Sequence, residues 1–256
     1  MRSQHIIANW KMNKDLKEAE VFALELAEKL KGTGKVRVII AAPYIHLPFL
    51  KDKANKKIGL AAQNLYPGEK GAFTGEISGN MLKPYVSYVI LGHSERRSLF
   101  GDNDQLVNEK IQSALFFNLR PIICLGETTE QKENGQTKQV LNDQLSVCLK
   151  GLKADEVAKC ILVYEPIWAI SSSPGATGQG DNPENAQVMH KLIRHFIEEK
   201  FGKELADKIP IIYGGSVNPQ NASDLLAMPD IDGGLVGKAS LPVNSFFEII
   251  EIAAKQ

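Results

Sequence analysis

The sequence predicts a single α/β domain, residues 1–256, that folds as a closed (β/α)8 barrel. Eight short apolar runs are spread along the whole chain, and most are continuous, as expected of parallel strands covered on both faces. Segments with helical signals lie between them, and no linker-like or low-complexity stretch divides the chain. The predicted strands are residues 5–10, 36–42, 58–62, 88–92, 121–125, 160–164, 209–213 and about 233–236.

The clearest predicted helix follows the first run and stops at Gly32. Its apolar residues recur every three or four positions, which is the spacing of one helix face. They are Leu16, Ala19, Ala23, Leu26, Ala27 and Leu30. After the sixth run, Asn182-Pro183-Glu184 predicts a helix start, with Asn182 as the N-cap and Pro183 at the first helical position. Asn218-Pro219 predicts the same signal after the seventh run.

A doubly wound open sheet is the alternative architecture. When that fold binds dinucleotides, a Gly-x-Gly-x-x-Gly turn follows its first strand, and no such turn follows residues 5–10. Eight strand-and-helix units without a break between them fit the closed barrel better.

Charge balance and apolar content exclude several classes of function. The 30 Lys and Arg residues balance the 30 Asp and Glu residues, so no broad positive field is available to attract nucleic acid or an anionic membrane. The first residues lack the apolar core of a signal peptide, and no stretch approaches the roughly 20 apolar residues that span a bilayer. We therefore expect a cytoplasmic protein with no nucleic-acid or membrane partner.

The cysteines and histidines predict neither a disulfide framework nor a metal site. Cys124, Cys148 and Cys160 are odd in number and widely separated, and they lack Cys-x-x-Cys spacing, so we expect reduced thiols. The 5 histidines form no ligand-spaced pair. We expect no metal and no cofactor.

Polar residues follow five of the predicted strands, at the end of the barrel where (β/α)8 enzymes carry their active sites. Each of these residues alone could have a purely structural role, because a lone Glu often caps a helix, a lone His is often structural and paired glycines form tight turns. Their convergence on one mouth favours a site that combines a base, an acid, a cation and backbone donors. These segments are Asn9-Trp10-Lys11, Gly92-His93-Ser94-Glu95, Glu165-Pro166, Gly214-Gly215-Ser216 and Gly237-Lys238.

These and further motifs resemble the triosephosphate isomerase family, in order and over essentially the whole chain. The His-Ser-Glu-Arg-Arg and Glu-Pro-x-Trp-Ala runs are specific signals, whereas the Gly-Gly-Ser turn alone is weak. The motifs are Asn9-Trp10-Lys11-Met12-Asn13, Ala72-Phe73-Thr74-Gly75-Glu76, Leu91-Gly92-His93-Ser94-Glu95-Arg96-Arg97, Cys124-Leu125-Gly126-Glu127, Tyr164-Glu165-Pro166-Ile167-Trp168-Ala169, Tyr213-Gly214-Gly215-Ser216-Val217 and Asp232-Gly233 through Leu241. The resemblance implies a TIM barrel and an aldose-ketose isomerase of glycolysis and gluconeogenesis that interconverts dihydroxyacetone phosphate and D-glyceraldehyde 3-phosphate.

The resemblance also implies catalytic roles. Glu165 moves a proton between adjacent carbons as the general base, and His93 donates to the carbonyl oxygens as a neutral imidazole at the start of a short helix. Lys11 supplies positive charge against the enediolate, and Asn9 orients the same oxygens. The role of Glu95 stays open: it tunes Lys11 or His93, relays a proton, or caps the helix.

By the same resemblance, a phosphate site lies after the last two strands. The backbone N–H groups of Ser216, Gly237 and Lys238 are expected to hold the phosphate, together with that of Ser171 when its loop closes. Lys238 stands where the family has the second glycine of a pair. Its side chain either points away or adds a charge near the phosphate.

A lid is expected from Pro166, Ile167 and Trp168 to Ala176, where closure would exclude water and suppress loss of phosphate from the enediolate. Residues 171–182 are longer than the short Gly-Thr-Gly-Lys-type tip of the family, and Pro174 removes one backbone donor. We expect a lid that closes with altered opening kinetics.

Residues 65–76 form a long loop for a barrel, and long loops are usually functional or disordered. The resemblance implies that this loop docks into a twin subunit. Thr74 would then lie beside the neighbour's Asn9 and Lys11, and Glu76 would pair with an arginine such as Arg96. We expect a homodimer.

Two rival functions come from other classes. A different phosphate-binding barrel enzyme, such as a lyase or a sugar-phosphate isomerase of amino-acid biosynthesis, would not be expected to keep Asn-x-Lys, His and Glu-Pro-x-Trp together. A non-catalytic relative that uses the barrel only for binding or assembly would be favoured by loss of Glu165, His93 or Lys11, and all three are present.

Overall fold

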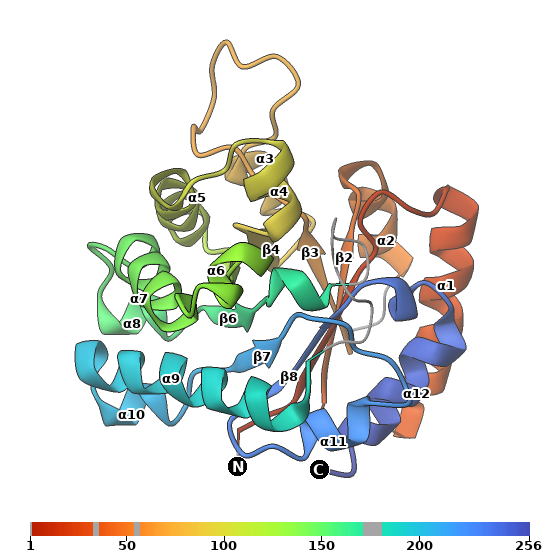
Figure 1. Ribbon diagram of the computed structural model, residues 1–256. Coiled ribbons are helices and arrows are strands. Elements are labelled where there is room, and N and C mark those ends of the chain that lie inside the picture. The colour runs from red at the N-terminus through yellow and green to blue at the C-terminus, as the bar shows by residue number, and fades with distance from the viewer. Residues whose placement is uncertain (1, 33–35, 54–56, 171–180) are drawn as a thin grey trace.

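The computed structural model describes residues 2–32, 36–53, 57–170 and 181–256. Within them all eight predicted strands form, and they pair in parallel and in chain order into a closed barrel, as β1 contacts both β2 and β8 (Figure 1). The predicted fold is therefore confirmed. The strands are β1 (His5–Asn9), β2 (Arg37–Ala42), β3 (Ile58–Ala62), β4 (Tyr88–Leu91), β5 (Arg120–Leu125), β6 (Ile161–Tyr164), β7 (Ile211–Tyr213) and β8 (Gly233–Val236).

Helices surround the barrel in the connections between strands (Figure 1). The α-helices are α1 (Leu16–Lys29), α2 (Leu47–Lys53), α3 (Gly79–Leu82), α4 (Ser94–Leu99), α5 (Asp104–Phe116), α6 (Thr129–Glu133), α7 (Thr137–Cys148), α8 (Ala154–Val157), α9 (Pro183–Phe201), α10 (Lys203–Ala206), α11 (Ala222–Leu226) and α12 (Val243–Ala253). Short 3-10 helices are η1 (Leu30–Gly32), η2 (Tyr44–His46), η3 (Ile167–Ala169) and η4 (Lys238–Ser240).

Two apolar clusters explain why the strands read as continuous apolar runs. One fills the barrel interior and includes Ile7, Ile90 and Ile212. The other lies between the strands and the helices and includes Ile6 and Phe246. Because successive strand residues point to opposite faces, a strand buried on both sides needs an apolar residue at every position.

The start of α1 is fixed by reciprocal hydrogen bonds that satisfy two backbone donors. The Glu18 N–H donates to the Asp15 carboxylate, and the Asp15 N–H donates to the Glu18 carboxylate, both at 2.8 Å. The predicted apolar face is buried at Ala19, Ala23 and Leu26. It packs α1 against the barrel.

One predicted helix start is confirmed and one is wrong. The Asn182 side chain caps α9 by accepting the Asn185 N–H at 2.7 Å, with Pro183 at the first helical position. After β7, however, the helix begins at Ala222 rather than at Pro219. The Asn218 side chain instead accepts from two backbone N–H groups, those of residues 220 and 221, so it closes a local turn before the helix.

Arg194 on α9 joins the helical layer to the segment just before β8 by charge-assisted hydrogen bonds. Its guanidinium donates to Asp230 at 2.6 Å and to Asp232 at 2.8 Å, and also to the carbonyl oxygens of Ala206 and Ile209. Arg194 and Asp232 are only 8% and 4% exposed. Breaking such a buried network by removing one partner is strongly destabilising, although Arg2 remains beside Asp232 at 2.5 Å.

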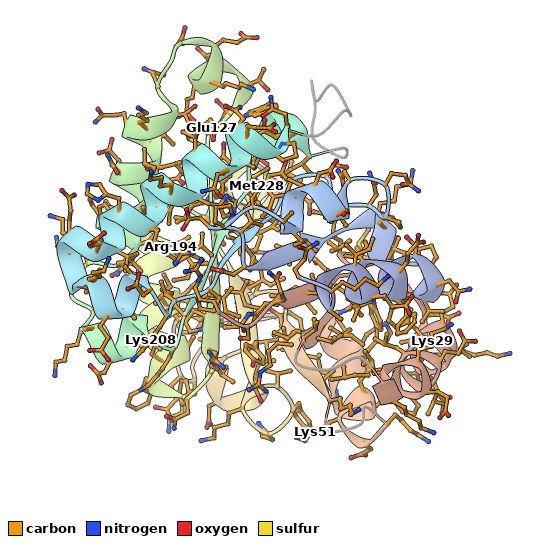
Figure 2. All side chains as sticks on the ribbon, turned by 90° about the horizontal axis from the view of Figure 1, so that it is seen from below. Lys29, Lys51, Glu127, Arg194, Lys208 and Met228 are labelled. Atoms are coloured by element: carbon orange, nitrogen blue, oxygen red, sulfur yellow. The ribbon has the colours of Figure 1, made fainter. Side chains whose placement is uncertain are left out.

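We expect Arg194→Met to lower the free energy of unfolding by about 3–5 kcal/mol, because it leaves both carboxylates without this guanidinium. Lys208→Met is the matched control, since Lys208 pairs with Glu204 at the surface and loss of such an exposed pair should change the stability little. Figure 2 labels both residues, on α9 and just after α10. Denaturant unfolding followed by circular dichroism measures the difference, and equal losses in the two variants would contradict the assignment.

Candidate active site

The carboxyl ends of the strands enclose a cavity of 870 Å³. It brings together seven of the residues that the sequence predicts for catalysis and phosphate binding, although they come from five different strand ends. They are Asn9, Lys11, His93, Glu165, Ser216, Gly237 and Lys238. The convergence expected from the strand order is therefore present in the fold.

Glu165 directly follows β6 and is 2% exposed. One carboxylate oxygen lies 3.0 Å from His93 Nε2, and the other accepts the Ser94 N–H at 3.0 Å. Burial alone would raise the pKa of Glu165, but the charge and hydrogen bond of His93, the Ser94 N–H and the charge of Lys11 outweigh burial and lower that pKa. The carboxyl group is thus held ionised inside the protein.

His93 is the N-cap of α4 and is also buried. Its Nδ1 accepts the Glu95 N–H at 3.2 Å, which leaves the proton of a neutral imidazole on Nε2, the nitrogen that faces Glu165. Burial by itself lowers the pKa of His93, whereas the neighbouring Glu165 carboxylate raises it above the ordinary value. The raising effect depends on Glu165 staying in this position.

Lys11 follows β1 with a φ of 52°, in the left-handed region that a non-glycine residue seldom adopts. Its N–H donates to the Asn9 side chain at 3.1 Å, and its carbonyl oxygen accepts from Gln63 at 3.0 Å. Its ammonium lies 2.5 Å from a Glu95 carboxylate oxygen. These contacts hold the Lys11 backbone in the left-handed conformation and its charge at the mouth of the barrel.

The predicted phosphate-binding residues line the cavity from the ends of β7 and β8. A side-chain carbon added to Gly237 would lie 3.7 Å from Lys11 Cε, so the turn after β8 lies directly beside the Lys11 side chain. The Ser216 N–H differs from expectation, because it donates to the Ala169 carbonyl at 3.2 Å rather than opening into the cavity. Lys238 is exposed at the cavity wall.

The first part of the predicted lid forms η3 after Pro166. Trp168 Nε1 donates to Glu127 at 2.8 Å, the Tyr164 hydroxyl donates to the same carboxylate oxygen at 3.1 Å, and the Ile167 N–H donates to the Glu127 carbonyl. Glu127 therefore anchors the base of the lid. Ser171, Pro174 and Ala176 lie outside the described residues.

Two of the three residues assigned to a subunit interface, Thr74 and Glu76, lie on a projecting part of the molecule. Figure 1 shows the segment between β3 and α3, which carries Thr74 and Glu76, extending away from the barrel body. Arg96 lies on α4 and pairs with Asp102 of its own chain at 3.1 Å. Met12, near Lys11, is 95% exposed.

Three residues at the site were missed by the sequence analysis, which did not assign them a role: Gln63, Ser94 and Glu127. Gln63 follows β3 directly and donates to the carbonyl oxygens of both Lys11 and Ala41. Its position after a strand end was the available signal. Glu127 stood within a quoted motif, but its contact with Trp168 joins positions that are far apart in sequence.

Other expectations concern what the chain lacks. In the described ranges no helix is long and apolar enough to cross a membrane. The same part of the chain holds no cluster of three or more metal-ligating side chains. Burial raises the pKa of the Cys148 and Cys160 thiols to about 12, and that of Cys124 is raised as well, so these free cysteines are poor nucleophiles.

The comparisons agree along the whole chain. The family model described as triosephosphate isomerase matches residues 4–253. A triosephosphate isomerase of Fusobacterium nucleatum is 46% identical over 253 residues, covering 98% of this chain and 99% of the relative. One of Carboxydothermus hydrogenoformans is 45% identical (98% and 99% covered), and one of Protochlamydia amoebophila is 44% identical (96% and 91% covered). With its barrel, its cavity and this similarity together, the chain belongs to the triosephosphate isomerase family.

Proposed function

We propose that this protein interconverts dihydroxyacetone phosphate and D-glyceraldehyde 3-phosphate by moving a proton through an enediolate. Family membership supplies the activity, which is that of an intramolecular aldose-ketose isomerase. The observation that carries the residue roles is the meeting of Glu165, His93 and Lys11 in one cavity. Turnover of glyceraldehyde 3-phosphate by the purified protein, with no metal or cofactor added, tests the activity, and its absence in the intact protein would favour the binding-only alternative.

Glu165 is proposed as the base that takes the proton next to the carbonyl. Its carboxylate oxygens are held by His93 and Ser94. To act it leaves these donors for the substrate carbon, at hydrogen-bond reach. The donors that lower its pKa are then lost while its burial remains, so the carboxylate becomes more basic at the moment it is needed.

His93 is proposed as the donor to the carbonyl oxygens. When Glu165 moves to the substrate, the Nε2–H loses its partner and is free to donate to an oxygen that gains charge. The Glu95 N–H bound at Nδ1 disfavours a second proton on the ring. The imidazole therefore donates as a neutral group.

Lys11 is proposed to supply fixed positive charge against the enediolate, with Asn9 orienting the same oxygens. The support for Glu95 is its position, since its carboxylate contacts Lys11 Nζ at 2.5 Å and lies 3.7 Å from His93 Nδ1. Of the open roles, tuning Lys11 fits the shorter contact best.

The phosphate is proposed to bind the backbone N–H groups of Gly237, Lys238 and Ser216, which line one wall of the cavity. The Ser216 N–H becomes available if the lid base moves and Ala169 withdraws its carbonyl oxygen. Lid closure over Pro166, Ile167 and Trp168 would thus be coupled to completion of the phosphate site. Ser171 would add its N–H from the closing loop.

A homodimer in the cytoplasm remains the proposed state of the protein. The support is a projecting segment between β3 and α3, which carries Thr74, together with the exposed Met12 and the half-exposed Phe73. Sedimentation of the purified protein and fractionation of the source cells test the two statements separately.

Thr74→Arg should convert the dimer to monomers and reduce kcat about 10²-fold, because it would place a cation against the neighbour's Lys11 and displace that residue. Ser223→Arg on α11 is the control, as Ser223 is exposed on a different part of the surface. Analytical ultracentrifugation beside the activity assay measures both effects. A Thr74→Arg protein that stays dimeric and active would remove the loop from the interface.

A further inference from the structure

Lys14 connects the β1–α1 loop, which carries Lys11, to the turn at residues 237–241 after β8. It lies three positions after Lys11, and its ammonium donates to the carbonyl oxygen of Leu241 at 2.8 Å. Leu241 is the C-cap of η4, which begins at Lys238 directly after Gly237. A single side chain thus spans from the β1–α1 loop to the far end of the turn proposed to bind phosphate.

The ammonium of Lys14 is held in place from several sides. It lies 4.7 Å from the centre of the Phe22 ring and 5.3 Å from that of the Trp10 ring, and both rings are buried. The two rings pack edge to face with centres 5.1 Å apart. They form a fixed platform on which the charged end of Lys14 rests while it donates to Leu241.

The backbone of Lys14 is fixed as well. Its φ of 70° lies in the left-handed region, where a non-glycine residue is strained. Its carbonyl oxygen lies 3.0 Å from Nε2 of His46, a residue that is 2% exposed. With both ends of the residue bound, Lys14 transmits the position of the β1–α1 loop to Leu241 with little freedom.

Hydrogen bonds within the turn at residues 237–241 fix its shape, and a bond from Lys14 fixes its position relative to the β1–α1 loop. The Ser240 hydroxyl and N–H both donate to the Gly237 carbonyl, at 2.7 and 2.8 Å, and the Leu241 N–H donates to the Lys238 carbonyl at 3.2 Å. These bonds fix the shape of the turn. The bond from Lys14 ties that shape to the loop that carries Lys11, and Leu241 and Asn13 both line the cavity.

We propose that Lys14 is a positioning residue of the phosphate site, which holds the turn at residues 237–241 at a fixed distance from Lys11. This inference rests on the proposed function, because it assumes that the turn binds the substrate phosphate. Because Lys14 positions the turn that would bind phosphate, its loss should weaken the binding of phosphate rather than slow proton transfer. Lys14 is not among the residues that line the cavity, so its role is to position the turn.

The test is Lys14→Met, which keeps a long unbranched side chain on the ring platform but removes the charged donor. Binding of inorganic phosphate, measured by calorimetry, should weaken about tenfold. The reason is that the turn at residues 237–241 loses the charge-assisted hydrogen bond from Lys14 to Leu241 that positions it. The KM for glyceraldehyde 3-phosphate should rise by a similar factor while kcat changes less than about twofold. Lys17→Met, at an exposed position of α1, the helix that follows Lys14, should change none of these values.

The outcomes separate the two claims. Unchanged phosphate binding and KM in folded Lys14→Met, or a fall in kcat without a rise in KM, would overturn the positioning role. Intact protein that binds phosphate but does not isomerise would overturn the proposed function, and a weaker phosphate affinity in Lys14→Met would then still support the positioning role. If Lys14→Met does not fold, Phe22→Leu decides, since removing one ring of the platform should weaken phosphate binding in the same direction, and an unaltered affinity would contradict the inference.

Discussion

Glu165→Gln lowers kcat for glyceraldehyde 3-phosphate by about 10²–10⁴-fold in this account, because an amide of the same shape cannot accept the substrate proton. The KM should stay close to that of the intact protein, since the proposed phosphate site does not include Glu165. A coupled assay that follows formation of dihydroxyacetone phosphate measures both values.

The Glu165→Gln variant must be shown to be folded before its loss of activity is interpreted. Glutamine keeps the size of the side chain, but its amide nitrogen faces either His93 or Ser94, both of which donate to Glu165 in the intact protein. We therefore expect some loss of stability, and thermal unfolding must show that the variant is folded at the assay temperature. A folded Glu165→Gln protein with more than about a tenth of the original kcat would exclude Glu165 as the base.

Lys11→Met should lower kcat/KM by about 10²–10³-fold, which is the usual cost of removing one fixed electrostatic contact to a developing oxyanion. The substitution removes the charge from the cavity and also the ion pair between Lys11 and Glu95, whose carboxylate lies 3.7 Å from His93 Nδ1. The loss of positive charge opposes formation of an enediolate. Steady-state kinetics with both triose phosphates as substrates would measure the loss.

Lys17→Met provides the matched control for Lys11→Met, because it removes an exposed lysine of the same protein at a position outside the cavity. It should retain the original kcat/KM. If Lys11→Met kept its activity within about tenfold of the intact protein, the enediolate charge would have to be balanced by other donors in the cavity.

The fold was predictable because its main requirement is simple. A strand that is covered inside and outside needs apolar residues at consecutive positions, and such runs stand out in the sequence. The start of α9 was predictable for a related reason, since the Asn182 cap and Pro183 act over a few neighbouring residues. The same local signal failed at Asn218 because the side chain closed a turn instead.

The site was predictable where its residues directly follow strands. Glu165, His93 and Lys11 each stand at such a position, so the closure of the barrel is enough to bring them together. Hydrogen bonds between distant positions were not predictable in this way. The bond from Lys14 to Leu241 and that from the Ser216 N–H to Ala169 depend on side-chain and loop geometry that no local pattern encodes.

Isomerisation in D₂O, followed by NMR of the product, tests whether Glu165 carries the proton between the two carbons. The chelator-treated protein is given glyceraldehyde 3-phosphate, and the product is trapped before it can react again. A carboxylic acid formed at Glu165 can exchange with solvent before it returns the proton, so we expect deuterium on the carbon that receives the proton in product formed by the intact protein, and little product from Glu165→Gln. Rapid isomerisation by the folded Glu165→Gln protein, with deuterium still entering the product, would contradict a base at Glu165.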